Sequence, residues 1–248
     1  MSPLPTPPSP ANTAAPSPPA PAAARPRLAI FGAGGLGREV LALAHQLNEA
    51  APTWELFGFF DDQPPAAPAR LGLPYRGTST DLLALGRAAN LPTPLHVAIA
   101  VGNGRHRAAV AERLRAAGPE LCFPSLVHPG VACQPYQRLQ IGQGCLIQQG
   151  CILTTDVTLG DFVLLNLGCT VGHDARLDDF CSLMPHANVG GGAHLSAGVY
   201  LGTNATVIQG VRVGARTIVG AGAVAVRDLP ADVTAVGVPA KAIMSYKL

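Results

Sequence analysis

Residues 141–224 decide the fold of this chain. Written in blocks of six they read IGQGCL IQQGCI LTTDVT LGDFVL LNLGCT VGHDAR LDDFCS LMPHAN VGGGAH LSAGVY LGTNAT VIQGVR VGARTI VGAGAV. The first residue of every block is aliphatic, from Ile141 to Val219, and the fifth is small or slender, from Cys145 to Ala223. A six-residue period fits neither an α-helix nor an isolated alternating strand, and it is typical of a parallel β-helix of hexapeptide repeats.

In such a β-helix each block forms one flat face of a triangular coil, so three blocks complete a turn. The first residue points inward and stacks on its equivalents above and below, and the fifth residue lies at a crowded corner. Two weaker blocks begin at Val127 and Cys133, followed by a two-residue slip at Leu139 and Gln140. The sequence therefore predicts about five coils, stacked at the strand spacing of about 4.8 Å, in a domain that spans 125–248.

The first 26 residues have a different composition from the rest. They contain ten of the 24 prolines of the chain together with many alanines, so we expect residues 1–26 to form a disordered or extended tail. The tail lacks the apolar region of a signal peptide. A net charge of +2 provides no basic surface for nucleic acid, and no apolar run approaches the roughly 18 residues of a membrane span. We expect a cytoplasmic protein that binds neither nucleic acid nor membrane.

Between these two regions, residues 27–124 alternate predicted strands with predicted helices. The strands are expected at 28–31, 56–60 and 96–100, and the helices at 38–48, 81–89 and 105–117. Thr78 to Thr80 supply capping residues for the second helix. The alternation predicts a small, parallel, Rossmann-like α/β domain.

The first predicted strand runs directly into a glycine turn, Gly32 to Gly37 (GAGGLG). Glycines let the backbone approach a phosphate, and the following helix N-terminus attracts its negative charge. With Asp61 placed to meet a ribose hydroxyl, an NAD-dependent oxidoreductase is one hypothesis. The domain has only about half the strands of a dinucleotide fold, which favours a mononucleotide or a nucleotide-sugar. A tight turn without a ligand is the third possibility.

Four of the six cysteines occupy the small fifth position of their blocks, namely Cys145, Cys151, Cys169 and Cys181. The chain has no C-x-x-C pair. We therefore interpret these cysteines as corner packing residues with reduced thiols.

His173, followed by Asp174, is the most informative polar residue of the repeats. A histidine is suited to general-base chemistry, and a carboxylate can fix its tautomer if the turn folds Asp174 back onto the ring. An exposed turn histidine without a role is the alternative. Zinc held with His186 and His194 would make a β-helical hydratase, but the three lie at different positions of their blocks, so we expect no metal.

The motifs follow one another in a specific order. GAGGLG is followed by FFDD at 59–62, AVGN at 100–103, the repeats with GHD at 172–174, and GVPAK at 237–241. This set resembles the bacterial sugar acetyltransferases of the sialic acid O-acetyltransferase and UDP-4-amino-sugar N-acetyltransferase family, from about Arg27 to the C-terminus.

The resemblance implies a Rossmann-like domain on a left-handed β-helix, and a homotrimer that binds acetyl-CoA between neighbouring β-helices. It makes His173 the general base and Asp174 its acidic partner, with Asn166 near the acceptor. It assigns the nucleotide-sugar to Gly34, Gly35, Leu36, Asp61, Asp62, Gly102 and Asn103. It assigns acetyl-CoA to Ser182, Gly191, Gly202, Thr203, Gly220, Ala221 and Lys241, with Ser182 standing where many members have a histidine.

From these residues we expect an acetyltransferase that moves acetyl from acetyl-CoA to an amino group of a nucleotide-linked sugar, most simply a UDP-4-amino-sugar. Transfer to a hydroxyl of a sugar or of sialic acid is the nearest alternative. The oxidoreductase, the zinc hydratase and a non-catalytic trimeric scaffold are alternatives from other classes.

Overall fold

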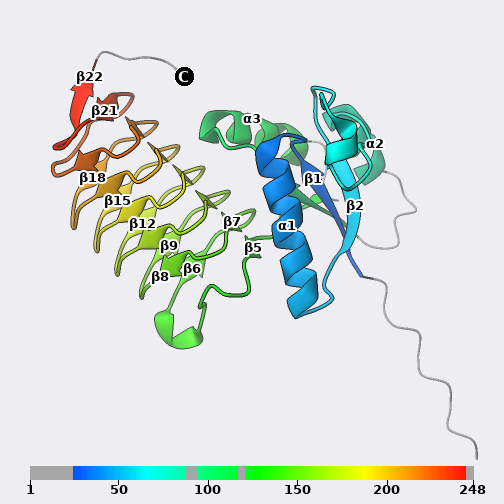
Figure 1. Ribbon diagram of the computed structural model, residues 1–248, viewed down its shortest axis with the longest axis horizontal. Helices are drawn as coiled ribbons and strands as arrows, with labels where there is room; N and C mark the ends of the chain where they lie inside the picture. The colour runs from blue at the N-terminus through cyan, green and yellow to red at the C-terminus, as the bar shows by residue number, and fades with distance from the viewer. Residues whose placement is uncertain (1–24, 88–93, 117–120, 244–248) are drawn as a thin grey trace, which may run out of the picture.

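The computed structural model describes residues 25–87, 94–116 and 121–243. Most of the predicted tail, residues 1–24, lies outside this range. In the described residues an α/β domain is followed by a long triangular coil of short strands, the parallel β-helix (Figure 1). No helix of the described residues is long and apolar enough to cross a membrane.

The α/β domain has a four-stranded parallel sheet in the order β2-β1-β3-β4. Its elements are β1 (Arg27–Phe31), α1 (Gly35–Ala50), β2 (Glu55–Phe60), η1 (Pro68–Arg70), α2 (Ser79–Gly86), β3 (Leu95–Ile99), α3 (Gly104–Arg115) and β4 (Leu121–Cys122). The predicted strands and helices are confirmed to within a few residues. Thr78 caps α2 and exchanges hydrogen bonds with Asp81, the capping box that starts the helix there.

The β-helix has three parallel faces, which we number in the order of the chain after β6. Face 1 contains β5 (Leu126–Val127), β7 (Leu146–Ile147), β10 (Leu164–Leu165), β13 (Ser182–Leu183), β16 (Tyr200–Leu201), β19 (Ile218–Val219), β21 (Thr234–Val236) and the antiparallel β22 (Lys241–Ile243). Face 2 contains β8 (Ile152–Leu153), β11 (Thr170–Val171), β14 (Asn188–Val189), β17 (Thr206–Val207) and β20 (Val224–Ala225). Face 3 contains β6 (Gln140–Ile141), β9 (Thr158–Leu159), β12 (Arg176–Leu177), β15 (His194–Leu195) and β18 (Arg212–Val213).

The coil has about six turns, one more than the sequence predicts. The coil ends with β20, which begins at the last residue of the last regular block, and with β21, which continues face 1 beyond the regular blocks. The predicted two-residue slip is present, because Leu126 pairs with Leu146 rather than with a residue 18 positions on. The weak block that begins at Cys133 forms no strand; the 3-10 helix η2 (Pro135–Gln137) lies within it.

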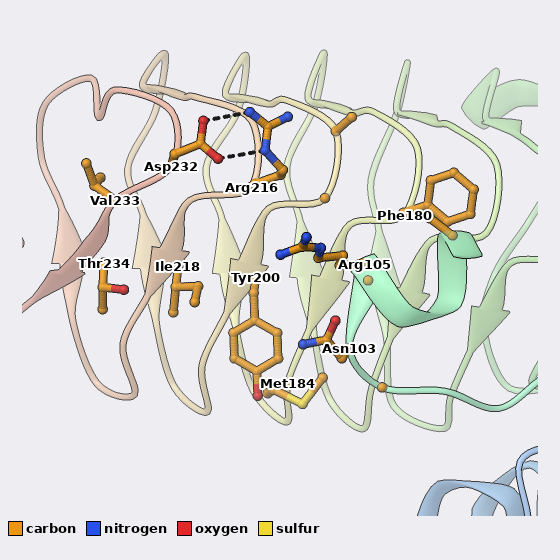
Figure 2. Close-up of a pocket in the computed structure, with 15 residues that line it drawn as sticks. Asn103, Arg105, Phe180, Met184, Tyr200, Arg216, Ile218, Asp232, Val233 and Thr234 are labelled. Carbon is orange, nitrogen blue, oxygen red and sulfur yellow. Dashed lines mark hydrogen bonds and ion pairs between the residues drawn. The ribbon is translucent and has the colours of Figure 1, made fainter. Parts of the chain in front are cut away.

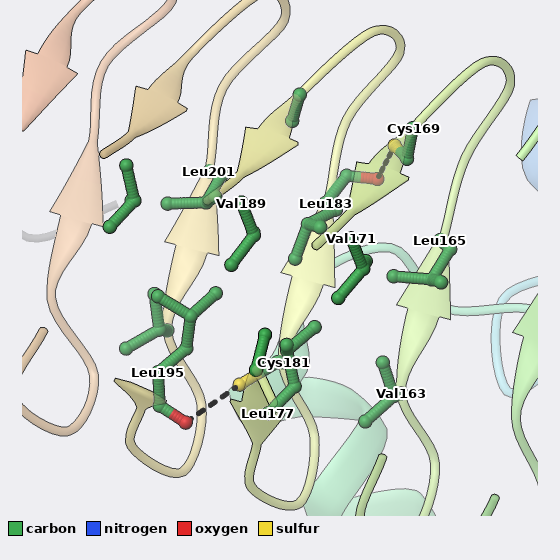
Figure 3. Close-up of a cluster of buried hydrophobic side chains, with 14 of the residues drawn as sticks. Val163, Leu165, Cys169, Val171, Leu177, Cys181, Leu183, Val189, Leu195 and Leu201 are labelled. Carbon is green, nitrogen blue, oxygen red and sulfur yellow. Dashed lines mark hydrogen bonds between the residues drawn. The ribbon is translucent and has the colours of Figure 1, made fainter. Parts of the chain in front are cut away.

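The first residue of each block fills the interior, as predicted. Leu165, Leu183 and Leu201 stack along face 1 and are fully buried (Figure 3). The cysteines at the fifth position are also buried and unpaired, and each thiol lies near a carbonyl of the next coil, as in Cys169 Sγ to Met184 O at 3.2 Å. Burial raises the pKa of Cys145 to about 11 and that of Cys181 to about 12, so these thiols stay protonated at neutral pH.

The fourth residue of every block, from Gly144 to Gly222, has a left-handed backbone with φ between 54° and 78°. Glycine adopts this conformation freely, but Phe162, Phe180 and Asp174 adopt it too. This left-handed residue turns the chain through each corner. Its own carbonyl points away from the ladder of hydrogen bonds that joins successive coils.

The α/β domain covers one end of face 1. The outward side chains of Leu126, Leu146 and Leu164 are buried in one cluster with residues of α1, including Val40 and Leu41. Farther along face 1, a groove of about 1050 Å³ separates the N-terminal end of α3 from the coil (Figure 2). Its floor is formed by Tyr200, Ile218 and Thr234, which the domain leaves uncovered.

Candidate active site

His173 and Asp174 lie at the corner between faces 2 and 3, which we call corner 2–3. The left-handed conformation of Asp174 (φ 60°) folds its carboxylate back, so that Oδ2 lies 2.8 Å from His173 Nδ1. Both side chains are more than half exposed, at 57% and 66%. A carboxylate at Nδ1 places the imidazole proton there and leaves Nε2 free as an acceptor, which is the arrangement of a general base.

Gly191 lies one coil farther on at the same corner, directly against the ring of His173. A Cβ on Gly191 would come within 2.6 Å of His173 Nε2, so only glycine leaves the imidazole in this position. The Gly191 N–H has no hydrogen-bond acceptor among the described residues, whereas Gly190 and Gly192 donate to Val207 and His173. A free N–H beside the base is the type of donor that stabilises an oxyanion.

The other predicted groove residues lie at the corner between faces 1 and 2, which we call corner 1–2. Asn166 is nearly buried there, and its side-chain oxygen accepts the N–H of Leu167. Gly202 lies directly below Ala221, since a Cβ on Gly202 would come within 2.5 Å of the Ala221 nitrogen. The N–H groups of Thr203 and Ala221 have no acceptor in the part of the chain that the structure describes, so they are available to a ligand.

Lys241 lies at the C-terminal end of corner 1–2. It pairs with Val236 across β21 and β22, and Val236 in turn lies over Gly220, at 2.8 Å from the position of a Cβ there. Its side chain is exposed and has no ion pair with a described residue. Asn166, Gly220 and Lys241 therefore follow one line along the β-helix.

Face 2 separates corner 1–2 from corner 2–3 in a single chain. Its outward residues are Ile152, Thr170, Asn188, Thr206 and Val224, none of them charged. By contrast, face 3 presents Arg176, His194 and Arg212. The predicted catalytic histidine and the predicted acceptor asparagine thus lie on opposite sides of one uncharged face and do not meet in the same chain.

The predicted nucleotide-sugar residues gather at the carboxyl edge of the sheet in the α/β domain. At Gly34 a Cβ would meet nothing within 4 Å, and at Gly35 only the far end of Arg38, so packing does not demand these two glycines. The N–H groups of Gly34, Gly35 and Leu36 have no acceptor among the described residues. The N-terminus of α1 is therefore open to an anion such as a phosphate.

Asp61 and Asp62, at the end of β2, frame this turn and already have protein partners. Asp61 accepts the N–H of Ala33 at 2.8 Å and so holds the glycine turn against β2. Asp62 accepts the N–H of Ser79 at the start of α2 and pairs with Arg113. Partial burial alone would raise the pKa of Asp62, but these hydrogen bonds and the guanidinium charge lower it. The Asp62 carboxylate is therefore an ionised acceptor at neutral pH.

Gly102 and Asn103 complete this edge. Gly102 lies close to Leu36, and Asn103 caps α3 by accepting the N–H of His106. Both residues also line the groove beneath α3 (Figure 2). The structure thus brings all seven predicted nucleotide-sugar residues to one edge.

Ser182 is the exception among the predicted cofactor residues. It is the outward residue of β13, but it is 1% exposed because α3 covers it. Its hydroxyl donates to the Gly102 carbonyl and accepts from Arg107. In the structure this side chain joins the two domains, and its burial gives the predicted contact with acetyl-CoA no support. The Ser182 hydroxyl supports Arg107, a residue that no sequence motif indicates.

The comparisons with known proteins agree with this architecture. Residues 27–114 match the family model of the PglD N-terminal domain. An alanine variant of the GDP-perosamine N-acetyltransferase of Caulobacter crescentus, solved with CoA and GDP-perosamine, is 32% identical, with a TM-score of 0.76 over 90% of this chain and 99% of that chain. The acetyltransferase domain of PglB from Neisseria gonorrhoeae, solved with acetyl coenzyme A, is 33% identical, with a TM-score of 0.77 over 89% and 100%.

A third structure, WeeI from Acinetobacter baumannii, shares the fold at 24% identity, with a TM-score of 0.71 over 88% of this chain and 99% of that chain. A search of curated proteins found no match.

Proposed function

The chain belongs to the hexapeptide-repeat sugar acetyltransferases, and we propose that it transfers the acetyl group of acetyl-CoA to an amino group of a nucleotide-linked sugar. The observation that carries this proposal is the free Nε2 of His173, which is held by Asp174 and packs against Gly191, whose N–H has no acceptor among the described residues. The two relatives above were solved with CoA or acetyl-CoA, and one of them with an amino-sugar nucleotide.

In the proposed reaction the sugar nitrogen attacks the thioester carbonyl while His173 Nε2 accepts a proton from it. Asp174 stabilises the imidazolium that forms. The N–H of Gly191, a residue that packs against the His173 ring, would donate to the oxyanion of the tetrahedral intermediate. Collapse of the intermediate breaks the carbon–sulfur bond, and the imidazolium of His173 gives its proton to the leaving sulfur, so that the CoA thiol and the amide are released.

Direct attack is favoured over an acyl-enzyme intermediate. The fifth-position cysteines of the coil are buried, and the raised pKa values of Cys145 and Cys181 keep these two thiols protonated. A thiol is nucleophilic as the thiolate, so these residues lack the activation that a nucleophile needs.

We propose a homotrimer in which the site is completed between subunits. If face 2 of each copy faces a threefold axis, corner 1–2 of one subunit lies against corner 2–3 of the next. Each contact then joins two different surfaces, and three such contacts close a ring. Asn166 of one copy then approaches His173 of another. The absence of charge on the outward residues of face 2, and the exposed aliphatic residues Ile152, Leu167 and Ile208 on or beside it, support this choice of interface.

Acetyl-CoA would then lie along corner 1–2, where the N–H groups of Thr203 and Ala221 are free and Lys241 provides a cation for the cofactor phosphates. The nucleotide-sugar would bind at the glycine turn, with its phosphates at the N-terminus of α1. A UDP-4-amino-sugar is our first candidate, and a GDP-linked amino-sugar is the second because one relative binds GDP-perosamine.

The test is release of free CoA thiol from acetyl-CoA by the purified protein, with UDP- and GDP-linked amino-sugars offered separately. We expect release that depends on one acceptor and is lost in His173→Ala. Equal release with a nucleotide-sugar that lacks the amino group would instead indicate O-acetylation. Absence of release with every acceptor would contradict the proposal.

A further inference from the structure

Arg107 is the most deeply buried charged side chain of the described residues, at 1% exposed, and it joins three parts of the molecule. Its Nε donates to the carbonyl of Phe162 at 2.9 Å. Its Nη1 donates to the carbonyls of Val101 and Gly102, at 2.6 and 3.1 Å. Its Nη2 reaches the Phe180 and Cys181 carbonyls and the Ser182 hydroxyl, at 2.8 to 3.0 Å.

The coil provides these acceptors for a reason specific to its corners. Phe162 and Phe180 both have the left-handed backbone, and neither carbonyl accepts a hydrogen bond from the backbone of the next coil. A buried carbonyl without a partner is costly, so a donor from outside the coil is required. Arg107 satisfies the two carbonyls on successive coils with one planar guanidinium.

The same side chain fixes the loop between β3 and α3. The carbonyl of Gly102 accepts from Arg107 and also from Ser182, so both groups hold it against the coil. Gly104, at the start of α3, lies so close to the coil that a Cβ would come within 2.4 Å of the Phe180 carbonyl. The loop that carries Gly102 and Asn103 therefore has one position relative to the β-helix.

No carboxylate pairs with Arg107 among the described residues, so neutral acceptors alone compensate for its buried charge. Burial lowers the pKa of this guanidinium to about 10, so it remains charged at neutral pH. Burying a cation is costly, and an apolar residue of similar length would be a simpler solution for packing alone.

We propose that Arg107, supported by Ser182, is a positioning residue that sets the distance between the nucleotide-sugar loop at Gly102–Asn103 and the β-helix that carries the acetyl-transfer site. The proposal rests on the function proposed above. It predicts that loosening this contact impairs use of the sugar and spares use of acetyl-CoA, which binds to the coil alone. A small displacement of a positioning group can cost about 10²-fold in rate.

The test compares three variants. Arg107→Lys retains the charge but cannot reach all six acceptors, and Ser182→Ala removes one contact from Arg107 and one from Gly102. Arg115→Gln is the matched control: Arg115 is on the same helix and also bridges to the coil, through Asp161 at 2.8 Å, but it lies far from Gly102 in the chain. Two readouts are measured, namely KM for each substrate and hydrogen exchange at the amides of residues 101–105.

We expect the KM for the nucleotide-sugar to rise about 10- to 100-fold in Arg107→Lys and by less in Ser182→Ala, with the KM for acetyl-CoA unchanged. Exchange at residues 101–105 should accelerate in both variants and remain unchanged in Arg115→Gln. Equal losses for both substrates, or a lower Tm with both KM values unchanged, would mean a purely structural arginine and overturn the proposal.

The exchange measurement needs no substrate. If the wild-type protein transferred acetyl to no acceptor, the proposed function would fail, while faster exchange in Arg107→Lys would still support the fixed loop. Unchanged hydrogen exchange at residues 101–105 in Arg107→Lys would overturn the positioning role of Arg107.

Discussion

The β-helix contains two histidine–aspartate pairs of nearly equal length in different surroundings. His173 and Asp174 meet at 2.8 Å on corner 2–3, and His194 and Asp178 meet at 2.9 Å on the flat of face 3. In the first pair the contact uses Nδ1, which leaves Nε2 free against Gly191. In the second the contact uses Nε2, and Asp178 is shared with Arg176 at 2.7 Å.

The second pair is also less accessible. His194 and Asp178 are 33% and 26% exposed, against 57% and 66% for the corner pair. The comparison teaches that a short contact with a carboxylate does not by itself identify a general base. The proposal of His173 as the base rests instead on the ring nitrogen that is left free and on the close approach of Gly191 to it.

The largest effect on kcat is expected from replacing His173, and replacing His194 should have little effect. His173→Ala should lower kcat for acetyl transfer by at least about 10²-fold, because general-base catalysis contributes about 10²- to 10⁴-fold. His194→Ala, the matched control, should retain most of the wild-type rate. Steady-state thiol release at saturating substrates measures both. Comparable losses of kcat in His173→Ala and His194→Ala would mean that His173 is not the general base that distinguishes the two pairs.

Replacing Gly191 should lower kcat nearly as much, because a side chain there would displace the His173 ring. Gly191→Ala puts a methyl group within 2.6 Å of the present position of Nε2, so the imidazole must move away from the acceptor. We expect kcat to fall about 10- to 100-fold, in the range for a displaced catalytic group. Gly210→Asn, one coil farther on with open space around it, is the control, since asparagine tolerates its left-handed backbone. An unchanged rate in Gly191→Ala would show that the ring does not act from this position.

The smallest effect concerns stability and tests the second pair. Burial on its own would raise the pKa of Asp178, but the contacts with His194 and Arg176 lower it. A carboxyl with a lower pKa in the folded state stabilises the protein above its unfolded pKa, and this contribution is lost as the pH falls through the folded value. Asp178→Asn should therefore cost about 0.2 to 1 kcal/mol at neutral pH, and the difference should shrink below about pH 4.

Urea unfolding of wild type and Asp178→Asn at several pH values measures this difference, and acetyl transfer should be unaffected. A difference that persists at the lowest pH would mean that packing, and not the carboxylate charge, stabilises this part of face 3.

Much of the molecule follows from local pattern. The six-residue period predicts the β-helix because every block repeats the same inward residue and the same small corner residue. The two-residue slip before Ile141 appears in the register of Leu126 with Leu146. The cysteines at the fifth position are buried and unpaired, as their place in the period predicts. The number of turns is underestimated because β21 lies beyond the regular blocks.

The sequence alone determined the two-domain order, the repeat and the motifs, since each depends on residues that are neighbours in the chain. Tertiary structure alone decided which arginine is buried. Arg105 and Arg107 are two residues apart, yet Arg105 lines the groove, whereas Arg107 is enclosed by carbonyls of two coils. It also decided that Ser182 serves the domain junction and that His173 and Asn166 lie at opposite edges of face 2. These outcomes depend on which coil a helix covers and which way a corner turns, and both are set by contacts between residues far apart in the sequence.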